Sequence, residues 1–93
     1  MLEKTIEKYL VQQVKSVGGL ALKWVSPGHA GVPDRIVFFP GGCVVLVELK
    51  APGKKPTPLQ TKIHENLKKL GAKVDVIDSM DEVKKFISRY TLP

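Results

Sequence analysis

One stretch constrains this chain most: residues 44–50, Val-Val-Leu-Val-Glu-Leu-Lys, a run of β-forming residues that ends in two charges. The run is apolar on both faces, which is typical of a central strand covered on both sides. Because side chains alternate along a strand, Glu48 and Lys50 are expected on one face and Leu49 on the other. An acid and a base at the end of a buried strand are costly to desolvate unless they are paired or used. We therefore expect a functional site at this rim of the sheet.

The rest of the chain predicts an α/β fold of one domain, residues 1–93, with the element order αβββαβ(α) and a mixed central sheet flanked by helices. The predicted elements are a helix over 3–17, strands over 20–25, 34–39 and 44–50, a helix from the cap Thr57 to Gly71, a strand over 73–77 and a final helix capped by Ser79. The turn at 40–42 makes the second and third strands antiparallel. The crossover through the second helix makes the fourth strand parallel to the third.

Apolar residues at helical spacing predict the buried side of each helix. The expected stripes are Leu2, Ile6, Leu10, Val14 and Val17 in the first helix, Leu59, Ile63, Leu67 and Leu70 in the second, and Met80, Val83, Phe86, Ile87 and Tyr90 in the third. Trp24 is expected in the core. His64, one turn after Gln60, is expected to be exposed to solvent, and an approach to the phosphate is the alternative.

The charge balance points to a polyanionic partner. Fifteen basic residues against nine acidic ones give a net charge of +6, which favours nucleic acid first and an anionic membrane surface second. The single cysteine, Cys43, excludes an internal disulfide and a multi-cysteine metal site. The N-terminal residues are charged from the start and no run is long enough to span a bilayer, so we expect a cytoplasmic protein without membrane contact.

Two carboxylates are expected to meet at the rim. Asp34 begins one strand of the predicted hairpin and Glu48 lies near the end of the other, fourteen residues on, so antiparallel pairing brings them together. Carboxylates held close repel each other, and a hard divalent cation such as Mg²⁺ or Mn²⁺ relieves that repulsion. The backbone carbonyl of Leu49 is a candidate further ligand. Lys50 would orient or deprotonate an attacking water, or hold a phosphate.

Other reactive or charged residues have both a functional and a plain structural explanation. Lys54 and Lys55 lie on a proline-stiffened loop suited to clamping a DNA backbone, and Lys23, Ser26 and His29 are further candidates for DNA contact. Each of them also suits an ordinary solvated surface. The rim residues also have a plain structural explanation. In that case Glu48 and Lys50 are an ion pair on an exposed strand end, and Asp34 is a turn residue.

The order and spacing of these residues resemble a known family. Gly31-Val32-Pro33-Asp34, then Val47-Glu48-Leu49-Lys50, then Leu59-Gln60, after an early helix that contains Ile6-Glu7, are similar to the PD-(D/E)XK nuclease superfamily. Within it the pattern resembles the virus-type replication-repair nucleases, VRR-NUC, in their minimal stand-alone form. The resemblance covers nearly the whole chain and implies a restriction-endonuclease-like core.

The resemblance also implies an activity and roles for single residues. It implies an endonuclease dependent on Mg²⁺ or Mn²⁺ that cleaves DNA phosphodiesters, with Asp34 and Glu48 as metal ligands and Lys50 as the catalytic lysine. Glu7 would be an acidic residue that the first helix brings to the site, unless it only pairs along its helix. Gln60 matches the glutamine that follows the lysine motif, and it also fits the third position of a capping box. The family further implies structure-selective cleavage, and small members are similar to Holliday-junction resolvases that act as homodimers.

Two readings of function remain at this stage. The first is a metal-dependent endonuclease that recognises the shape of branched DNA, because the chain contains no module for reading bases. The second is a DNA-binding module that keeps the nuclease fold without catalysis, or that cleaves only beside a partner protein. Cleavage that requires a divalent cation separates the two.

Overall fold

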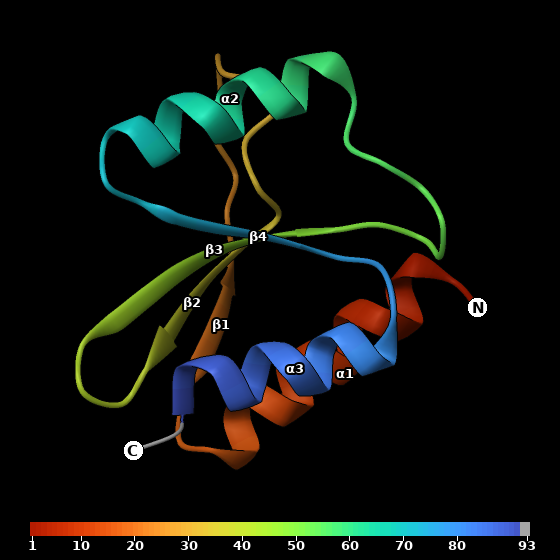
Figure 1. Cartoon of the computed structure of the whole chain (residues 1–93), viewed down its shortest axis with the longest axis vertical. Coiled ribbons are helices and arrows are strands. Elements are labelled where there is room, and N and C mark those ends of the chain that lie inside the picture. The colour runs from red at the N-terminus through yellow and green to blue at the C-terminus, as the bar shows by residue number, and fades with distance from the viewer. Residues whose placement is uncertain (92–93) are drawn as a thin grey trace.

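The protein has the predicted order of elements. The computed structural model describes residues 1–91 (Figure 1). Its elements are α1 (Glu3–Ser16), β1 (Leu20–Lys23), β2 (Arg35–Phe39), β3 (Cys43–Leu49), α2 (Pro58–Lys69), β4 (Lys73–Ile77) and α3 (Met80–Thr91). None of the helices within residues 1–91 is long and apolar enough to cross a membrane.

The sheet has the order β1-β2-β3-β4, with three antiparallel strands and one parallel edge strand. The β2–β3 hairpin pairs Phe39 with Cys43 next to the turn and Arg35 with Val47 at the far end. β4 runs parallel to β3 and pairs Leu49 with Ile77. Both strand directions were expected from the tight turn and from the crossover helix. β3, which contains most of the apolar run 44–50, is therefore an inner strand with a neighbour on each side.

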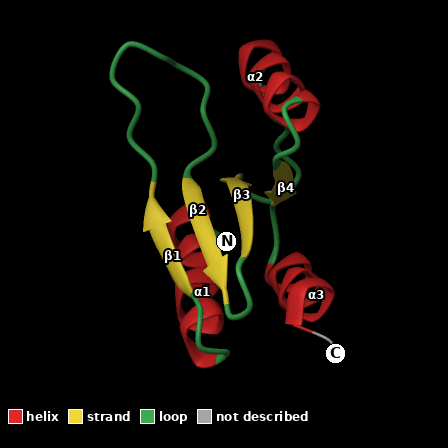
Figure 2. Ribbon diagram, turned by 90° about the vertical axis from the view of Figure 1, so that its left-hand side faces the viewer, coloured by secondary structure: helices red, strands yellow, loops and turns green. Residues whose placement is uncertain are grey.

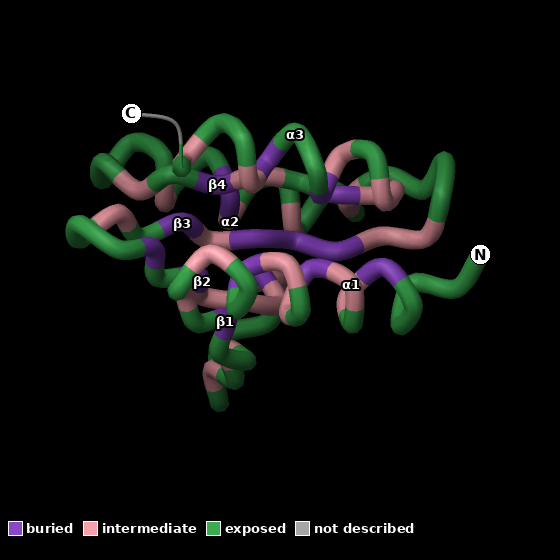
Figure 3. Tube along the Cα trace, turned by 90° about the horizontal axis from the view of Figure 1, so that it is seen from below, coloured by how far each residue is buried: buried purple, intermediate pink, exposed green. Residues whose placement is uncertain are grey.

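Two faces of the sheet have different cover. α1 and α3 pack on one face, here called the inner face, and α2 lies over the other, the outer face (Figures 1 and 2). The core lies between the sheet and the layer formed by α1 and α3, where the buried stretches of the tube concentrate (Figure 3). Its residues are Ile6, Leu10, Val14, Ala21, Val37, Phe39, Val45, Val47, Leu49, Ile77, Val83 and Phe86. The stripes expected for α1 and α3 supply five of these side chains.

The stripe expected for α2 is wrong at both ends, although Ile63 and Leu67 in its middle are partly buried. Leu59 is 50% exposed and Leu70 is 86% exposed, whereas His64 is the buried residue of this helix. The physical reason is that α2 turns a polar side toward the sheet, because that side faces the acidic rim of β3. The start of the helix is as predicted, since Thr57 and Gln60 form a complete capping box with Pro58 in the first turn.

Candidate active site

Asp34 and Glu48 lie next to each other on the outer face. Arg35 pairs with Val47, so the register places Asp34 opposite Glu48 one residue further along the hairpin. The Leu49 N–H donates a 2.8 Å hydrogen bond to Asp34 Oδ2, which turns this carboxylate toward β3. The loop before Asp34 also packs closely on α2. A Cβ on Gly31, whose φ is +87°, would lie 3.2 Å from the side chain of Leu59.

Side chains from β3 and α2 surround the Glu48 carboxylate. Lys50 Nζ lies 3.8 Å from Glu48 Oε2, as expected for two residues that share a strand face. Gln60 Nε2 donates a long hydrogen bond of 3.4 Å to the same oxygen. Gln60 Oε1 meanwhile accepts from the Thr57 N–H at 2.9 Å, so one side chain both caps the helix and reaches the site. The two roles considered for Gln60 therefore coexist in its contacts.

Glu48 holds its proton more tightly than an ordinary glutamate. The residue is 2% exposed. Its pKa is raised from 4.5 to about 8, first by burial and then by the hydrogen bond and negative charge of Asp34, while the Lys50 ammonium opposes the rise. Glu3, in the first turn of α1, adds a smaller upward effect on the same pKa. The contact with Lys50 therefore becomes a full ion pair only when Glu48 ionises.

His64 is a member of this site, and the expectation that it would be exposed is wrong. It is 5% exposed, one helical turn after Gln60, and its Nε2 lies 3.4 Å from Glu48 Oε1. Burial and the nearby Lys68 and Lys50 lower the pKa of His64, so the imidazole is uncharged at neutral pH. The two facing atoms are buried, yet their geometry does not make a hydrogen bond, and each lacks any other partner. Such orphaned polar atoms are costly unless a ligand satisfies them.

The acid pair fits a hard divalent cation. Glu48 Oε1 has no hydrogen-bond partner, and a cation would offset the repulsion that raises the pKa of Glu48. Across residues 1–91, no group of three or more His, Cys, Asp and Glu side chains is arranged to hold a metal ion. A cation here would therefore take two carboxylates, Asp34 and Glu48, and complete its shell with water and backbone oxygen. This is the mixed coordination that Mg²⁺ accepts.

Glu7 lies in a different contact. Its Oε2 accepts a 2.9 Å hydrogen bond from Arg35 Nε, and Arg35 also donates to the Ala21 carbonyl at 3.1 Å. Both side chains are partly buried between α1 and β2, beside a cavity of about 400 Å³ that Lys4 and Lys8 also line. The α1 carboxylate that acts on the pKa of Glu48 is Glu3, not Glu7. A role for Glu7 at the site stays a prediction.

The candidate DNA contacts differ in exposure. Lys23, Lys54 and Lys55 are exposed, and the loop that carries the last two is tied to β4 by a 3.3 Å bond from the Gly53 N–H to Asp78. Ser26 and His29 form a turn through a 3.1 Å backbone bond. Both also line a cavity of about 290 Å³ between this loop and α2. Their role in DNA contact remains a prediction.

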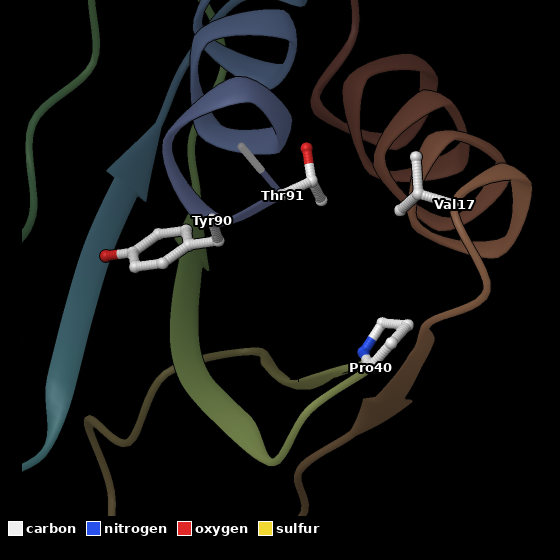
Figure 4. Close-up of a pocket in the computed structure, with 4 residues that line it drawn as sticks. All are labelled: Val17, Pro40, Tyr90 and Thr91. Atoms are coloured by element: carbon white, nitrogen blue, oxygen red, sulfur yellow. The ribbon is translucent and has the colours of Figure 1, made fainter. Parts of the chain in front are cut away.

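Trp24 is not a core residue, contrary to expectation. It is half-buried and lines the same cavity, together with Ile63, Leu67 and Leu70. The backbone N–H of Trp24 donates to the Asp34 carbonyl at 2.9 Å, so Trp24 continues β1 directly beside the acidic rim. A separate cavity of about 280 Å³, lined by Val17, Pro40, Tyr90 and Thr91, lies by the hairpin turn and has no charged lining residue (Figure 4). This cavity lies at the far end of the hairpin from Asp34 and Glu48.

Comparisons with known proteins agree with this arrangement. A phage protein named "Putative nuclease p44", from Acyrthosiphon pisum secondary endosymbiont phage 1, is 54% identical over 79 residues, 85% of each chain. A solved structure described as "VRR_NUC domain" superposes with a TM-score of 0.88 at 37% identity, covering 95% of this chain and 96% of that one. The chain belongs to the VRR-NUC nuclease family. A scan against models of protein families finds no match.

Membership in the VRR-NUC family confirms the resemblance and the restriction-endonuclease-like fold. Family membership supports a nuclease function, which agrees with the basic charge of the chain. The motif residues of this VRR-NUC domain converge from three elements: the start of β2, the end of β3 and the first two turns of α2. The position of His64 one turn after Gln60 pointed to the site, because residues four apart share a helix face, but an exposed helical histidine was the favoured expectation.

Proposed function

We propose that this protein is a DNA endonuclease dependent on Mg²⁺ or Mn²⁺, selective for branched DNA such as a Holliday junction, and active as a homodimer. The observation that carries the proposal is the state of Glu48. It is buried beside Asp34 with its pKa raised to about 8 and with one carboxylate oxygen that has no partner. A structural carboxylate would be paired, whereas a metal ligand awaits its cation.

In this proposal Asp34 and Glu48 hold the cation, with the Leu49 carbonyl as a further oxygen. The cation would supply Lewis-acid stabilisation of negative charge on the scissile phosphate. Lys50, with its ammonium 3.8 Å from Glu48, holds that phosphate or moves a proton to or from the attacking water. Gln60 donates a hydrogen bond to one oxygen of the Glu48 carboxylate and His64 lies 3.4 Å from the other, so both limit how this carboxylate can turn. These two residues hold the ligand in place and do not touch the substrate.

DNA binding follows from charge in this proposal. The net charge of +6 and the exposed lysines Lys23, Lys54 and Lys55 suit phosphate contacts, so affinity is expected to fall steeply as salt rises. Recognition of shape fits a short domain without a base-reading element. A symmetric dimer would present two sites to a substrate with two-fold character.

The test is cleavage of labelled four-way junction, flap, single-stranded and linear duplex DNA with Mg²⁺, Mn²⁺ or EDTA. The wild type is compared with Lys50→Ala and with Lys15→Ala, an exposed lysine on α1. We expect cutting of branched DNA that needs a divalent cation, is lost in Lys50→Ala and is kept in Lys15→Ala. Cutting in EDTA, or an active Lys50→Ala, would refute the proposal. Binding without cleavage under every condition would favour the non-catalytic module.

A further inference from the structure

Trp24 lies in the same row across the sheet as the two acids of the candidate site. β1 and β2 pair Lys23 with Arg35. The next residue, Trp24, donates its backbone N–H to the Asp34 carbonyl at 2.9 Å and so stands opposite Asp34, which in turn lies opposite Glu48. Directly opposed residues have Cβ atoms about 5 Å apart, so Trp24 is roughly 5 Å from Asp34 and roughly 10 Å from Glu48 across the strands.

A cavity of about 290 Å³ opens beside this row, between Trp24 and α2. Its walls are α2 and the loop that joins β1 to β2, and both extend beyond the same end of the sheet (Figures 1 and 2). Gly31 lets the two walls approach closely, because a Cβ there would lie 3.2 Å from the Leu59 side chain and 3.3 Å from that of Ile63. The width of the cavity therefore follows from the packing of this loop on the helix.

The lining of the cavity is apolar and uncharged. Three half-buried side chains, Trp24, Ile63 and Leu67, contribute to it, and the exposed His29 and Asn66 line it as well. An imidazole and an amide can each donate and accept hydrogen bonds. The described residues that line the cavity include no Lys, Arg, Asp or Glu, so it offers no counter-charge to a phosphate group.

A nucleobase fits both the volume and the lining. It is a flat ring system with hydrogen-bonding groups along its edge, and bases stack on aromatic side chains such as Trp24. Pockets for small ligands start at roughly 300 Å³, so about 290 Å³ suits one such ring system and excludes a helix or a folded peptide.

The position of the cavity decides which base reaches it. The proposed function places the scissile phosphate at Asp34 and Glu48, roughly 5–10 Å from Trp24 along the row. Successive nucleotides of a stacked strand are about 3.4 Å apart, so the base belongs to a nucleotide close to that phosphate. A paired base points into the duplex and reaches the cavity only after it leaves the stack.

We propose that the cavity beside Trp24 receives one unstacked base of the DNA next to the scissile phosphate, with the Trp24 indole as its stacking platform. The inference deepens the proposed function and rests on it for the position of that phosphate. Extruding a base costs least where the base has already lost its pairing or stacking partner, as at a branch point. The cavity therefore gives the site a preference for branched over linear duplex DNA. Stacking tolerates any base, so this preference is independent of sequence.

The first test reads Trp24 directly, because it is the single tryptophan of the chain. Its emission is titrated with four-way junction, single-stranded and linear duplex DNA, in EDTA for the wild type and in Mg²⁺ for Lys50→Ala. The proposed function predicts no cleavage in either condition. We expect bound junction and single-stranded DNA to quench the emission strongly and bound linear duplex to quench it weakly, because only an unstacked base lies against the indole.

The second test combines a change in the protein with a change in the DNA. Trp24→Leu removes the aromatic face, and an abasic nucleotide, placed in turn at each position near the branch, removes one base and keeps its phosphate. At one position we expect each change alone to weaken binding roughly tenfold and both together to weaken it no further. Trp24→Phe, which keeps an aromatic ring, should retain most of the affinity.

Val25→Ala is the matched control, because Val25 is 77% exposed beside Trp24 and does not line the cavity. It should bind as the wild type does. Trp24→Leu should keep the wild-type slope of log affinity against log salt, because a base contact releases no counterions. Circular dichroism checks the fold of each variant. If Trp24→Leu does not fold, quenching of the wild type by intact and abasic junctions decides.

Unquenched emission on bound junction DNA overturns the proposal. Losses that add at every abasic position overturn it too, because additivity shows that indole and base do not touch. Metal-dependent cutting of junctions without quenching or coupling would remove the base site and leave the nuclease assignment standing. Quenching and coupling in a protein that cleaves nothing would support the base site and refute the activity. A protein that binds no DNA refutes both.

Discussion

Asp34 accepts a 2.8 Å hydrogen bond from the Leu49 N–H, and this bond joins the start of β2 to the end of β3. It makes Asp34 both a structural tie and a candidate metal ligand, and two substitutions separate these roles. Asp34→Asn keeps an oxygen acceptor but removes the charge, so we expect Mn²⁺ affinity to fall at least tenfold while stability changes by under about 0.5 kcal/mol. Asp34→Ala also orphans the N–H, which costs about 1–3 kcal/mol. Calorimetric Mn²⁺ titration and chemical unfolding measure the two effects. Undiminished Mn²⁺ binding by Asp34→Asn would remove Asp34 from the ligand set.

Glu48 predicts how stability depends on pH without metal. Its pKa rises from 4.5 to about 8 on folding, so the folded protein binds more protons than the unfolded chain between these values. The free energy of unfolding therefore falls as pH rises through this window, by up to about 1.4 kcal/mol per pH unit. Chemical unfolding in EDTA between pH 7.5 and 8.5 measures the slope, above the range in which His64 titrates in the folded protein or, at its ordinary value of 6.5, in the unfolded chain. Glu48→Gln should flatten the slope, and so should a saturating divalent cation, because it favours the ionised carboxylate. An equal slope in Glu48→Gln would contradict the assignment.

His64 offers a test of how the Glu48 carboxylate is held. Its Nε2 is 3.4 Å from Glu48 Oε1, and residues that orient a ligand typically contribute 10–100-fold to metal affinity. We expect His64→Ala to weaken Mn²⁺ binding roughly tenfold, and His64→Gln, which keeps a donor, to recover part of the loss. The other histidine, His29, is exposed and provides the control His29→Ala. Equal Mn²⁺ affinities in His64→Ala and the wild type would show that His64 only fills space.

Local patterns in the sequence predicted most of the fold, because turns, helix caps and strand alternation are set by residues close together in the chain. The hairpin follows from Pro40-Gly41-Gly42 between two β-forming runs, and the Thr57 cap marks where α2 starts. The encounter of Asp34 with Glu48 follows from hairpin register alone. Each feature depends on residues near one another in the chain or on one alternation rule.

The environment of α2 could not be predicted in the same way. The apolar stripe of a helix faces the sheet only when the sheet offers an apolar surface there. Here the outer face ends in Asp34 and Glu48, so α2 presents Gln60 and His64 to it and leaves Leu59 and Leu70 exposed. Which face of the sheet a helix covers is a long-range property. The same limit hid the half-exposed position of Trp24.

Glu7 allows the sequence prediction and the observed contact to be tested against each other. The residue was expected at the metal site, but its carboxylate pairs with Arg35 at 2.9 Å, with both side chains under one-fifth exposed. If the ion pair is its whole role, Glu7→Gln leaves a partly buried guanidinium without its counter-charge and costs about 1–2 kcal/mol of stability. We expect that loss in chemical unfolding, together with unchanged Mn²⁺ affinity by calorimetry.

Glu3→Gln is the matched control for Glu7→Gln, because Glu3 is the exposed α1 acid whose charge raises the pKa of Glu48. It should leave stability nearly unchanged and lower the pKa of Glu48 slightly, which a metal-free pH titration of unfolding would detect. A tenfold loss of Mn²⁺ affinity in Glu7→Gln, with stability intact, would instead place Glu7 among the metal ligands. The Arg35 contact would then have to exchange for the cation when the site fills, because one carboxylate oxygen cannot serve both at full strength.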